Sequence, residues 1–564
     1  MTSASYLNPV YPHSFPDPFV LKHRGEYWGY CTGFWHDGRA FGVMRSRDLV
    51  RWEPLAGALE PLPGGHTCYW APEVAYLDGR FHLYYSVGNE ERMEIRVAVA
   101  DHPAGPFEDS GRRLTAEPFA IDAHVFTDRH GERWLFYATD FLERSHIGTG
   151  TVRDRMLDPF TLAGDPRPVT LPRHDWHVYH PNRPEKGYVR WHTVEGSFVL
   201  ERKGLYYQMF SGGNWQNPTY GIGYATARGL GTREEWEQAA LPILRSGGEV
   251  IGPGHNSVVR GPDNRQLYCV YHRWSPDSSA RVPAIDPLDW AGERMLVLGP
   301  TTTPQPAPIP PTVSDLGPIR LGPEEAARYE VGASSFLIEV TARGSGFAIE
   351  LEDGAGTVMR LGSASRSPTA DHLLRVEVDG LRGSFTLDGL LLWQGRLERP
   401  ADRVALVAGR DAAEFAGFAL TPGWEDLFVE EGGRLRVAGS EIVRGPAFAE
   451  YELVVNARVD GESGGWSIAP ALDGESGARL VLERREGAWI LASTVAGEQI
   501  FPLPAGFDPF RDQQFRFRKA GGAVEVSWEG IVLGTLPAPP GPTRIGLGGK
   551  SASFEMARVT AVRG

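Results

Sequence analysis

Five segments of the chain repeat one pattern, in which a polar or charged residue leads into a short apolar run. The segments are FPDPFV at 15–20, WAPEVAY at 70–76, IDAHVF at 121–126, VEGSFVL at 194–200 and GPGHNSVV at 252–259. A second apolar run follows each of them across a turn that is polar or contains glycine, as in EYWGYCTG and RFHLYYSVG. Apolar runs of this length, rich in β-branched and aromatic residues and bounded by turns, predict β-strands.

The leading polar residues of these segments recur along the chain, and we call them the anchor residues: Asp17, Glu73, Asp122, Glu195 and His255. Their spacing of 49 to 73 residues matches a unit of several strands, the blade of a β-propeller. The pattern therefore predicts an all-β chain in which residues 1–305 form a five-bladed propeller. Because innermost strands meet at the propeller axis, the anchor residues are expected to converge on one shallow depression.

The remainder of the chain has a different pattern. TTTPQPAPIPPTV, residues 301–313, is dense in proline and predicts an extended linker. Beyond it, the segments 382–409 and 521–549 resemble each other, and Asp388-Gly389 corresponds to Glu529-Gly530 at an offset of 141 residues. Two related β-sandwich domains are the simplest interpretation, over residues 306–424 and 425–564.

Composition and charge narrow the range of partners and compartments. The net charge of −14 disfavours nucleic acid, and no run of about 18 apolar residues predicts a membrane span. The three cysteines, Cys31, Cys68 and Cys269, lie in or beside strands, as expected for buried thiols in a reducing compartment. The N-terminus shows no secretory signal pattern, so we expect a cytoplasmic protein. The sequence carries no signal for a particular oligomeric state.

Glu195 is the strongest candidate for chemistry. It lies between apolar residues before a glycine and a strand, and burial raises the pKa of a carboxyl group, which suits a proton donor. Alone, such a glutamate would more often be an ordinary loop residue, but convergence with the other anchor residues favours a general acid. Glu73 is expected to orient substrate or neighbouring residues. His255 fits a core histidine and an axial functional residue equally well.

A second group of titratable residues lies between the predicted third and fourth blades. HDWHVYH, residues 174–180, contains three histidines and one aspartate, which is a composition found in metal sites. Neither a helix nor a strand would place all three imidazoles side by side next to Pro181 and Pro184, so a loop or pocket wall is favoured over a metal site. The chain has no G-x-S-x-G motif for a nucleophilic serine and no phosphate-binding loop with lysine.

Seven motifs in the predicted propeller resemble glycoside hydrolase family 43. They are PDPFV at 16–20, SRDLVRWE at 46–53, YWAPEV at 69–74, IDAHVF at 121–126, VEGSFV at 194–199, GPGHNSVV at 252–259 and RVPAIDPLDW at 281–290. The resemblance covers about residues 8–300. It implies Asp17 as general base, Asp122 as the residue that orients the acid and modulates its pKa, and Glu195 as general acid.

The same resemblance implies that His255 lies on the axis near a water-coordinated ion, often calcium, and that no cofactor takes part in the chemistry. It also implies an arginine that reaches the sugar, for which Arg281 matches the motif better than Arg273. Three tryptophans are candidates for stacking on sugar rings, with core packing as the equal alternative: Trp35, Trp70 and Trp215.

These features predict an inverting, exo-acting glycosidase that removes a terminal pentose from short oligosaccharides, α-L-arabinofuranosyl in preference to β-D-xylosyl. In inverting hydrolysis, two carboxyl groups about 6.5–9.5 Å apart act on opposite faces of the sugar. The alternatives are an arabinan- or galactan-directed hydrolase of the same family, and a carbohydrate-binding propeller without catalysis. The complete set of Asp17, Asp122 and Glu195 argues against the latter. The C-terminal domains are open to three roles: binding carbohydrate, walling the pocket or mediating association.

Overall fold

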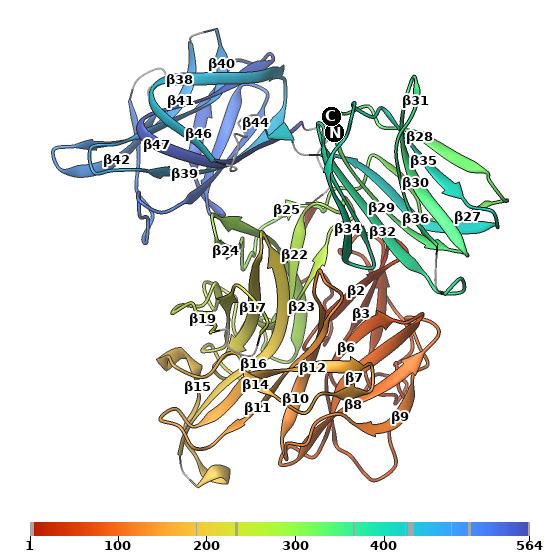
Figure 1. Ribbon diagram of the computed structural model, residues 1–564. Coiled ribbons are helices and arrows are strands. Elements are labelled where there is room, and N and C mark those ends of the chain that lie inside the picture. Colours follow the sequence, from red (N-terminus) through yellow and green to blue (C-terminus); the bar gives the residue numbers. More distant parts are fainter. Residues whose placement is uncertain are drawn as a thin grey trace. The chain divides into compact units, whose positions relative to one another are not determined.

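A computed structural model describes residues 5–187, 189–231, 235–364, 367–423, 425–426, 434–474, 476–493 and 498–561 (Figure 1). The described residues form strands, turns and two short 3-10 helices, η1 (Asp175–His177) and η2 (Pro184–Lys186), with no α-helix among them. No helix in this part of the chain is long and apolar enough to cross a membrane. The expectation of an all-β chain is therefore confirmed.

The chain forms two compact units. One contains residues 2–288 and 299–423, and the other contains residues 289–298 and 424–564. The segment 289–298, which was expected to belong with the propeller, clusters with the C-terminal domain instead. Its contacts explain this, because Arg294 pairs with Glu529 and the backbone carbonyl of Trp290 accepts from Asn456 at 3.2 Å.

Four sheets correspond to the five predicted blades, because blades three and four belong to one sheet. Blade one consists of β2 (Phe19–His23), β3 (Glu26–Tyr30), β4 (Val43–Ser46) and β5 (Trp52–Pro54). Blade two consists of β6 (Cys68–Leu77), β7 (Arg80–Gly88), β8 (Met93–Ala100) and β9 (Glu108–Arg113). Blade three consists of β10 (Ala120–Thr127), β11 (Arg133–Phe141) and β12 (Gly148–Asp158), with the short strands β13 (Thr161–Leu162) and β14 (Arg167–Pro168). Blade four consists of β16 (Val189–Arg202), β17 (Leu205–Gly212) and β18 (Gly221–Ala227), with β15 (Val178–Arg183), β19 (Glu237–Gln238) and β20 (Leu244–Arg245). Blade five consists of β21 (Gly254–Arg260), β22 (Leu267–Trp274), β23 (Arg281–Ala291) and β24 (Arg294–Val297).

The innermost strands of the five blades close into a ring. Strand β2 contacts β6, β6 contacts β10, β10 contacts β16, β16 contacts β21, and β21 contacts β2 again. The second strands β7 and β17 are buried along almost their whole length, as expected for sheets that are packed on both faces. Aromatic side chains such as Tyr30, Tyr69 and Tyr85 fill the space between blades one and two. This is a five-bladed β-propeller.

Blades three and four are also joined edge to edge. The start of β16 runs parallel to β12, with Gly148 opposite His192 and Thr149 opposite Thr193. The predicted linker region contributes β25 (Gln305–Pro306), which pairs with β1 (Ser5–Tyr6). Because β1 precedes the first blade and β25 follows the last, this pairing ties the two ends of the propeller segment together.

The first C-terminal domain is a sandwich of two antiparallel sheets around one core. One sheet has the order β26-β36-β29-β32-β33-β34 with β27 beside β36, and the other has the order β28-β35-β30-β31. The strands are β26 (Val313–Asp315), β27 (Ile319–Leu321), β28 (Ala326–Glu330), β29 (Ser335–Arg343), β30 (Gly346–Asp353), β31 (Gly356–Ala364), β32 (His372–Asp379), β33 (Arg382–Leu387), β34 (Leu390–Arg396), β35 (Arg403–Ala408) and β36 (Ala413–Pro422).

This sandwich packs on the end of the propeller where the innermost strands finish. Asp371 forms ion pairs with His23 at 3.0 Å and Arg24 at 2.6 Å, at the turn between β2 and β3. Arg375 donates to the carbonyl of Asn264 at 2.9 Å, in the turn between β21 and β22. Asp17 and His255 lie at the opposite ends of the same two strands. The contacts of the described residues therefore place the sandwich away from the predicted site, and they do not support a role in walling it.

The second C-terminal domain is built from one sheet that encloses its own core. Its order is β43-β42-β41-β40-β47-β39-β44-β45-β46, with β37 and β38 beside β47, and each of the strands β38 to β47 contributes to one hydrophobic cluster. The strands are β37 (Glu425–Asp426), β38 (Arg434–Phe448), β39 (Tyr451–Val459), β40 (Trp466–Asp473), β41 (Ser476–Arg485), β42 (Ala488–Ser493), β43 (Gln499–Phe501), β44 (Gln513–Ala520), β45 (Ala523–Trp528), β46 (Ile531–Pro537) and β47 (Thr543–Ala561).

The internal repeat noted in the sequence corresponds to two matching hairpins. Asp388 and Gly389 connect β33 to β34 with φ of 52° and 82°, and Glu529 and Gly530 connect β45 to β46 with φ of 45° and 88°. Two successive residues of positive φ form the tight turn that fits the twist of antiparallel strands. The three cysteines are buried and free, as predicted.

Candidate active site

Each innermost strand of the propeller carries one residue in the left-handed region of φ. These five left-handed residues are Asp17 at 52°, Ala71 at 44°, Asp122 at 61°, Gly196 at 63° and His255 at 47°. The register shows one extra residue at this point in β6, β10, β16 and β21, which is a β-bulge. Bulges redirect side chains and are frequent beside active sites. The bulges turn the backbone at the same level of each strand, next to the propeller axis.

This equivalence corrects two details of the sequence interpretation. In blade two the left-handed residue is Ala71 and the anchor residue Glu73 follows two positions later. In blade four it is Gly196, so Glu195 immediately precedes the bend and lies inside β16 rather than at a strand entrance. Sequence spacing alone could not locate the bends, because their backbone conformation is not tied to one residue type.

The amide groups of four of the left-handed residues are held by side chains that lie in, or just after, the second strand of a neighbouring blade. A non-glycine residue in this conformation costs about 1–2 kcal/mol, so the bends need such support. Ala71 donates to Thr32 Oγ1 at 2.8 Å, Asp122 to Ser86 Oγ at 2.9 Å, His255 to Ser211 Oγ at 2.7 Å and Asp17 to His272 Nδ1 at 3.2 Å. In blade four the amide of Gly196 instead donates to Asp122 Oδ2, at 3.1 Å.

Asp17 is surrounded by groups that favour its ionised form. Its carboxylate accepts hydrogen bonds from Thr32 Oγ1 at 2.6 Å and from Arg281 Nη1 at 2.8 Å, and His272 Nδ1 lies 3.1 Å away. Burial opposes ionisation, but Arg281, His255 and His272 together hold the pKa of Asp17 well below its usual value. Asp17 is therefore a carboxylate at any pH near neutrality.

Glu195 has the opposite electrostatic environment. Burial raises the pKa of its carboxyl group to about 7, and the negative charge of Asp17 adds to that effect. Tyr220 donates a hydrogen bond to Glu195 Oε1 at 2.9 Å, which together with Arg281 limits the rise. A carboxyl group with a pKa near the working pH can hold a proton and release it, as a general acid must.

Asp122 connects these two groups. Burial raises the pKa of Asp122 well above its usual value, and the charges of Glu195 and Asp17 raise it further. Its Oδ2 accepts from the amide beside Glu195 and lies 4.0 Å from Nδ1 of His255, which is itself 3.6 Å from Oδ1 of Asp17. Burial lowers the pKa of His255, so its imidazole is neutral near pH 7. The three predicted carboxyl groups thus lie around one axial imidazole.

Arg281 is the arginine that the structure brings to the site. Its guanidinium lies over the ring of Trp215 at 4.4 Å while it bonds Asp17, and Trp215 stacks on Trp274 with the ring centroids 6.1 Å apart and an interplanar angle of 14°. Arg273 lies elsewhere: it donates to the backbone carbonyls of Asn8 and Thr301 at 3.3 Å and 3.2 Å, outside the group around Asp17.

This arrangement can be compared with known proteins. Residues 6–295 match the family model of glycosyl hydrolases family 43. The chain belongs to this family. A β-D-galactofuranosidase of Aspergillus niger is 30% identical over 305 residues, which is 50% of this chain and 80% of the relative. An extracellular exo-α-(1→5)-L-arabinofuranosidase of Streptomyces chartreusis is 28% identical over 48% of this chain and 82% of the relative. The crystal structure of a thermostable family-43 glycoside hydrolase is 34% identical, covers 54% of this chain and 99% of that chain, and gives a TM-score of 0.48.

Membership of family 43 makes the propeller half of the chain a glycosidase. The resemblance inferred from the seven sequence motifs is confirmed. The match to the family model ends at residue 295, so it says nothing of the two C-terminal domains.

Two of the three candidate tryptophans lie within packed clusters. Trp35 is half-buried, donates from Nε1 to the carbonyl of Leu55 at 2.7 Å and meets Phe15 edge to face. Trp70 is half-buried against a cluster that includes Ile121. Of the three candidate tryptophans, Trp215 is the one found in direct contact with Arg281.

Glu73 orients a neighbour, which is one of the two roles expected from the sequence. Its carboxylate lies 2.8 Å from Nδ1 of His124, and Nε2 of the same imidazole accepts from the amide of Val199 at 3.0 Å. Burial raises the pKa of Glu73, although His124 opposes this. The contacts connect blades two, three and four just below the bends of Asp122 and Gly196.

The histidine-rich segment 174–180 is not arranged as a metal centre. Nδ1 of His177 accepts from the amide of Arg173 at 3.1 Å, and Nδ1 of His180 accepts from the amide of Asn182 at 3.2 Å. Among the described residues, no group of three or more His, Cys, Asp or Glu side chains is placed to hold a metal ion. Trp176 of this segment stacks on Phe210 at 5.9 Å, so the segment covers blade four as a packed loop.

Sequence reasoning missed three residues of the site: Thr32, Tyr220 and His272. A signal for two of them exists, because Thr32, Ser86, Ser211 and His272 occupy related places near the end of the second apolar run, in YCTG, YYSVG, MFSGG and VYHRW. Tyr220 has no comparable signal, since it follows β17 in an irregular loop and reaches Glu195 only through the fold.

Proposed function

We propose that this family-43 protein is an inverting, exo-acting glycosidase that removes a terminal pentose from short oligosaccharides, α-L-arabinofuranosyl in preference to β-D-xylosyl. The observation that carries the proposal is the opposite ionisation of two carboxyl groups around one axis. Asp17 is held as a carboxylate by Arg281, Thr32 and His272, whereas burial keeps a proton on Glu195 up to a pH of about 7.

Each residue of the site has its own role in the proposed hydrolysis. Glu195 donates its proton to the glycosidic oxygen as the bond to the leaving group breaks, and Asp17 takes a proton from the water that attacks the opposite face of the sugar. Asp122 accepts from the amide of Gly196 and so fixes the backbone that carries the acid, while the charge of Glu195, when present, raises the pKa of Asp122. Arg281 and Trp215 form a wall against which a sugar can be oriented.

The preference for furanosides is supported by the relatives. The names of the two proteins described above give a galactofuranosidase and an arabinofuranosidase, both of which act on sugars with five-membered rings. The second relative is also named as exo-acting. For the present chain, removal of a furanosyl unit agrees with both names, and end-wise removal of an arabinofuranosyl unit agrees with the second.

A panel of aryl glycosides, with proton NMR of the first-formed sugar, tests this proposal. We expect faster release from the α-L-arabinofuranoside than from the β-D-xyloside, and a first product of inverted anomeric configuration. Cleavage of the xyloside with no detectable cleavage of the arabinofuranoside would reverse the preference. A first product of retained configuration would rule out the roles given to Asp17 and Glu195.

Two alternatives are separated by other measurements. An arabinan- or galactan-directed hydrolase would release products of several lengths from the polymer, whereas an exo-acting enzyme releases single sugars. A carbohydrate-binding propeller without catalysis would leave every glycoside intact in the presence of wild-type protein.

A cation on the axis is part of the proposal, and His255 is the residue that could hold it. Calcium prefers six to eight oxygen ligands, and no group of three or more potential ligands is found among the described residues. Water would therefore have to supply most of the coordination shell. Such a cation would stabilise the negative charges of Asp17 and Asp122, which flank the imidazole.

A further inference from the structure

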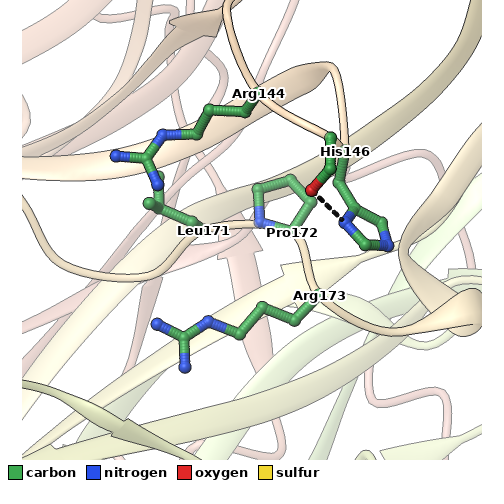
Figure 2. Close-up of a pocket in the computed structure, with 6 residues that line it drawn as sticks. Arg144, His146, Leu171, Pro172 and Arg173 are labelled. Atoms are coloured by element: carbon green, nitrogen blue, oxygen red, sulfur yellow. Dashed lines mark hydrogen bonds between the residues drawn. The ribbon is translucent and has the colours of Figure 1, made fainter.

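A second pocket lies outside the group of catalytic residues, between blades three and four. It has a volume of about 300 Å³ and is lined by Arg144, Ser145, His146, Leu171, Pro172 and Arg173. Figure 2 shows the side chains of Arg144 and Arg173 extending on the same side of the pocket, above and below Leu171 and Pro172. Leu171 and Pro172 are buried, so the pocket combines an apolar floor with two cationic walls.

The two guanidinium groups lack an acidic partner in the described part of the chain. No carboxylate lines the pocket, and the contact found for the guanidinium of Arg144 is with the ring of Phe141 at 5.7 Å. Nearby Arg190 shows the usual arrangement, since it bonds Asp175 at 3.1 Å. In a chain with a net charge of −14, a pocket with two arginines and no acid is a local exception.

An adjoining pocket of about 340 Å³ shares Ser145 and His146 and is also lined by Arg190 and His192. The rings of His146 and His192 meet edge to face at 4.9 Å. Burial lowers the pKa of His174, and Arg173 and His146 lower it further. The two guanidinium groups of Arg144 and Arg173 make an anion the ligand that the charge of the pocket favours.

The position of the pocket relative to the catalytic residues follows from the strand pairing. Ser145 and His146 lie in the loop before β12, and Gly148 at the start of β12 is opposite His192 of β16. Glu195 is three residues farther along β16, which corresponds to about 10 Å of strand. The pocket therefore lies on the same end of the propeller as the catalytic residues, within reach of a short oligosaccharide.

We propose that this pocket binds the carboxylate of an acidic sugar, a uronic acid unit, on the oligosaccharide whose terminal pentose occupies the catalytic site. The inference rests on the proposed function and specifies its substrate class. Guanidinium groups form charge-assisted, often bidentate hydrogen bonds with carboxylates, which Arg144 and Arg173 are free to offer. Leu171 and Pro172 provide a surface for the apolar face of the sugar ring.

Binding to the inactive Glu195→Gln protein tests the pocket separately from turnover. Calorimetry would compare a pentose oligosaccharide that carries a uronic acid branch with the same oligosaccharide after reduction of the carboxyl group. We expect the acidic form to bind about tenfold more tightly, as one charge-assisted contact predicts. In Arg144→Gln/Arg173→Gln the two forms should bind equally. Arg112→Gln/Arg155→Gln, which removes two exposed arginines of β9 and β12, should keep the tenfold difference.

Three outcomes would overturn the inference: equal binding of the two forms to the Glu195→Gln protein, an unchanged preference in Arg144→Gln/Arg173→Gln, or loss of the preference in the Arg112/Arg155 control. Inorganic phosphate at millimolar concentration distinguishes a site for any anion from a site for an acidic sugar. Phosphate that abolishes the preference would overturn the assignment to a sugar carboxylate. If the acidic oligosaccharide binds tenfold more tightly but the wild-type protein cleaves no glycoside, the proposed function is rejected and the inference about the pocket is retained.

Discussion

The hydroxyl group of Tyr220 donates a hydrogen bond of 2.9 Å to Oε1 of Glu195. The phenol ring is held in place by stacking on His272, with the centroids 5.7 Å apart and the planes at 10°. It is also held by Gly254, where a Cβ atom would lie 2.1 Å from the ring. The contact favours the ionised form of Glu195 and opposes the effect of burial on its pKa.

The pH dependence of kcat/KM should therefore reflect this contact. Glu195 acts in its protonated form, so activity should fall as the pH rises through its pKa of about 7. In Tyr220→Phe the donor is absent, the pKa of Glu195 should rise, and the alkaline limb should move to higher pH. Hydrolysis rates of an aryl glycoside between pH 4 and 10 would show the shift. An alkaline limb that moves to lower pH would contradict the assigned role.

Glu195→Gln should abolish most of the activity on natural oligosaccharides. Loss of a general acid costs about 10²–10⁴-fold in rate. Aryl glycosides with acidic leaving groups should lose less, since their departure needs little protonation. Glu201→Gln is a matched control on the same strand, because Glu201 pairs with Arg129 at the far end of β16. Equal losses on both substrate types would argue against proton donation by Glu195.

Asp17→Asn should stop turnover while sugar binding remains measurable. Asparagine keeps the shape of the side chain but removes the charge that accepts a proton from water, so a loss of about 10³-fold in kcat is expected. Calorimetry with a pentose oligosaccharide and thermal unfolding of the variant would check binding and folding. A variant that fails to fold would instead identify Asp17 as a structural residue.

Asp371 should contribute strongly to stability without affecting catalysis. Its carboxylate forms ion pairs with His23, Arg24 and Arg343 where the first sandwich meets the propeller. Asp371→Ala leaves these groups unpaired and should lower the free energy of unfolding by about 3 kcal/mol. Urea denaturation would measure the loss. Asp402→Ala is the control, because its pair with Arg403 is exposed and worth at most about 1 kcal/mol.

The Asp371 contribution should also depend on pH. Burial opposes ionisation of this carboxyl group, but His23 and Arg24 lower its pKa below the ordinary value. A carboxylate with a lowered pKa stabilises the fold above its unfolded pKa of about 4, and this stabilisation is lost as the pH falls. The stability difference between wild type and Asp371→Ala should therefore shrink below pH 4.

Calcium should raise the melting temperature if the proposed axial cation is present. A ligand that binds only the folded state stabilises it in proportion to the logarithm of its concentration. After dialysis against a chelator, addition of calcium should restore the melting temperature and the activity together. In His255→Ala, calcium should have no effect on melting. A melting temperature that is insensitive to chelator and calcium would contradict the cation.

The propeller could be predicted from sequence because each blade repeats a polar residue, an apolar run and a turn. The seven motifs identified the family, and the structure places Asp17 and Asp122 beside His255, with Asp122 bonded to the amide that follows Glu195. The left-handed bends could not be located, since alanine, glycine, aspartate and histidine all occur at them. Tyr220 was missed because no local pattern connects a loop residue to a carboxyl group 25 positions earlier.

At the five left-handed bends, the backbone conformation of the site is fixed independently of the side chains that carry its chemistry. Each bend is secured by the main-chain amide group, mostly through a hydroxyl from the adjacent blade, and does not depend on the side chain at the bend itself. Ala71 shows that such a position tolerates a side chain with no chemical role. New specificities could therefore arise in this architecture by exchanging single residues at the hub while the surrounding strands stay unaltered.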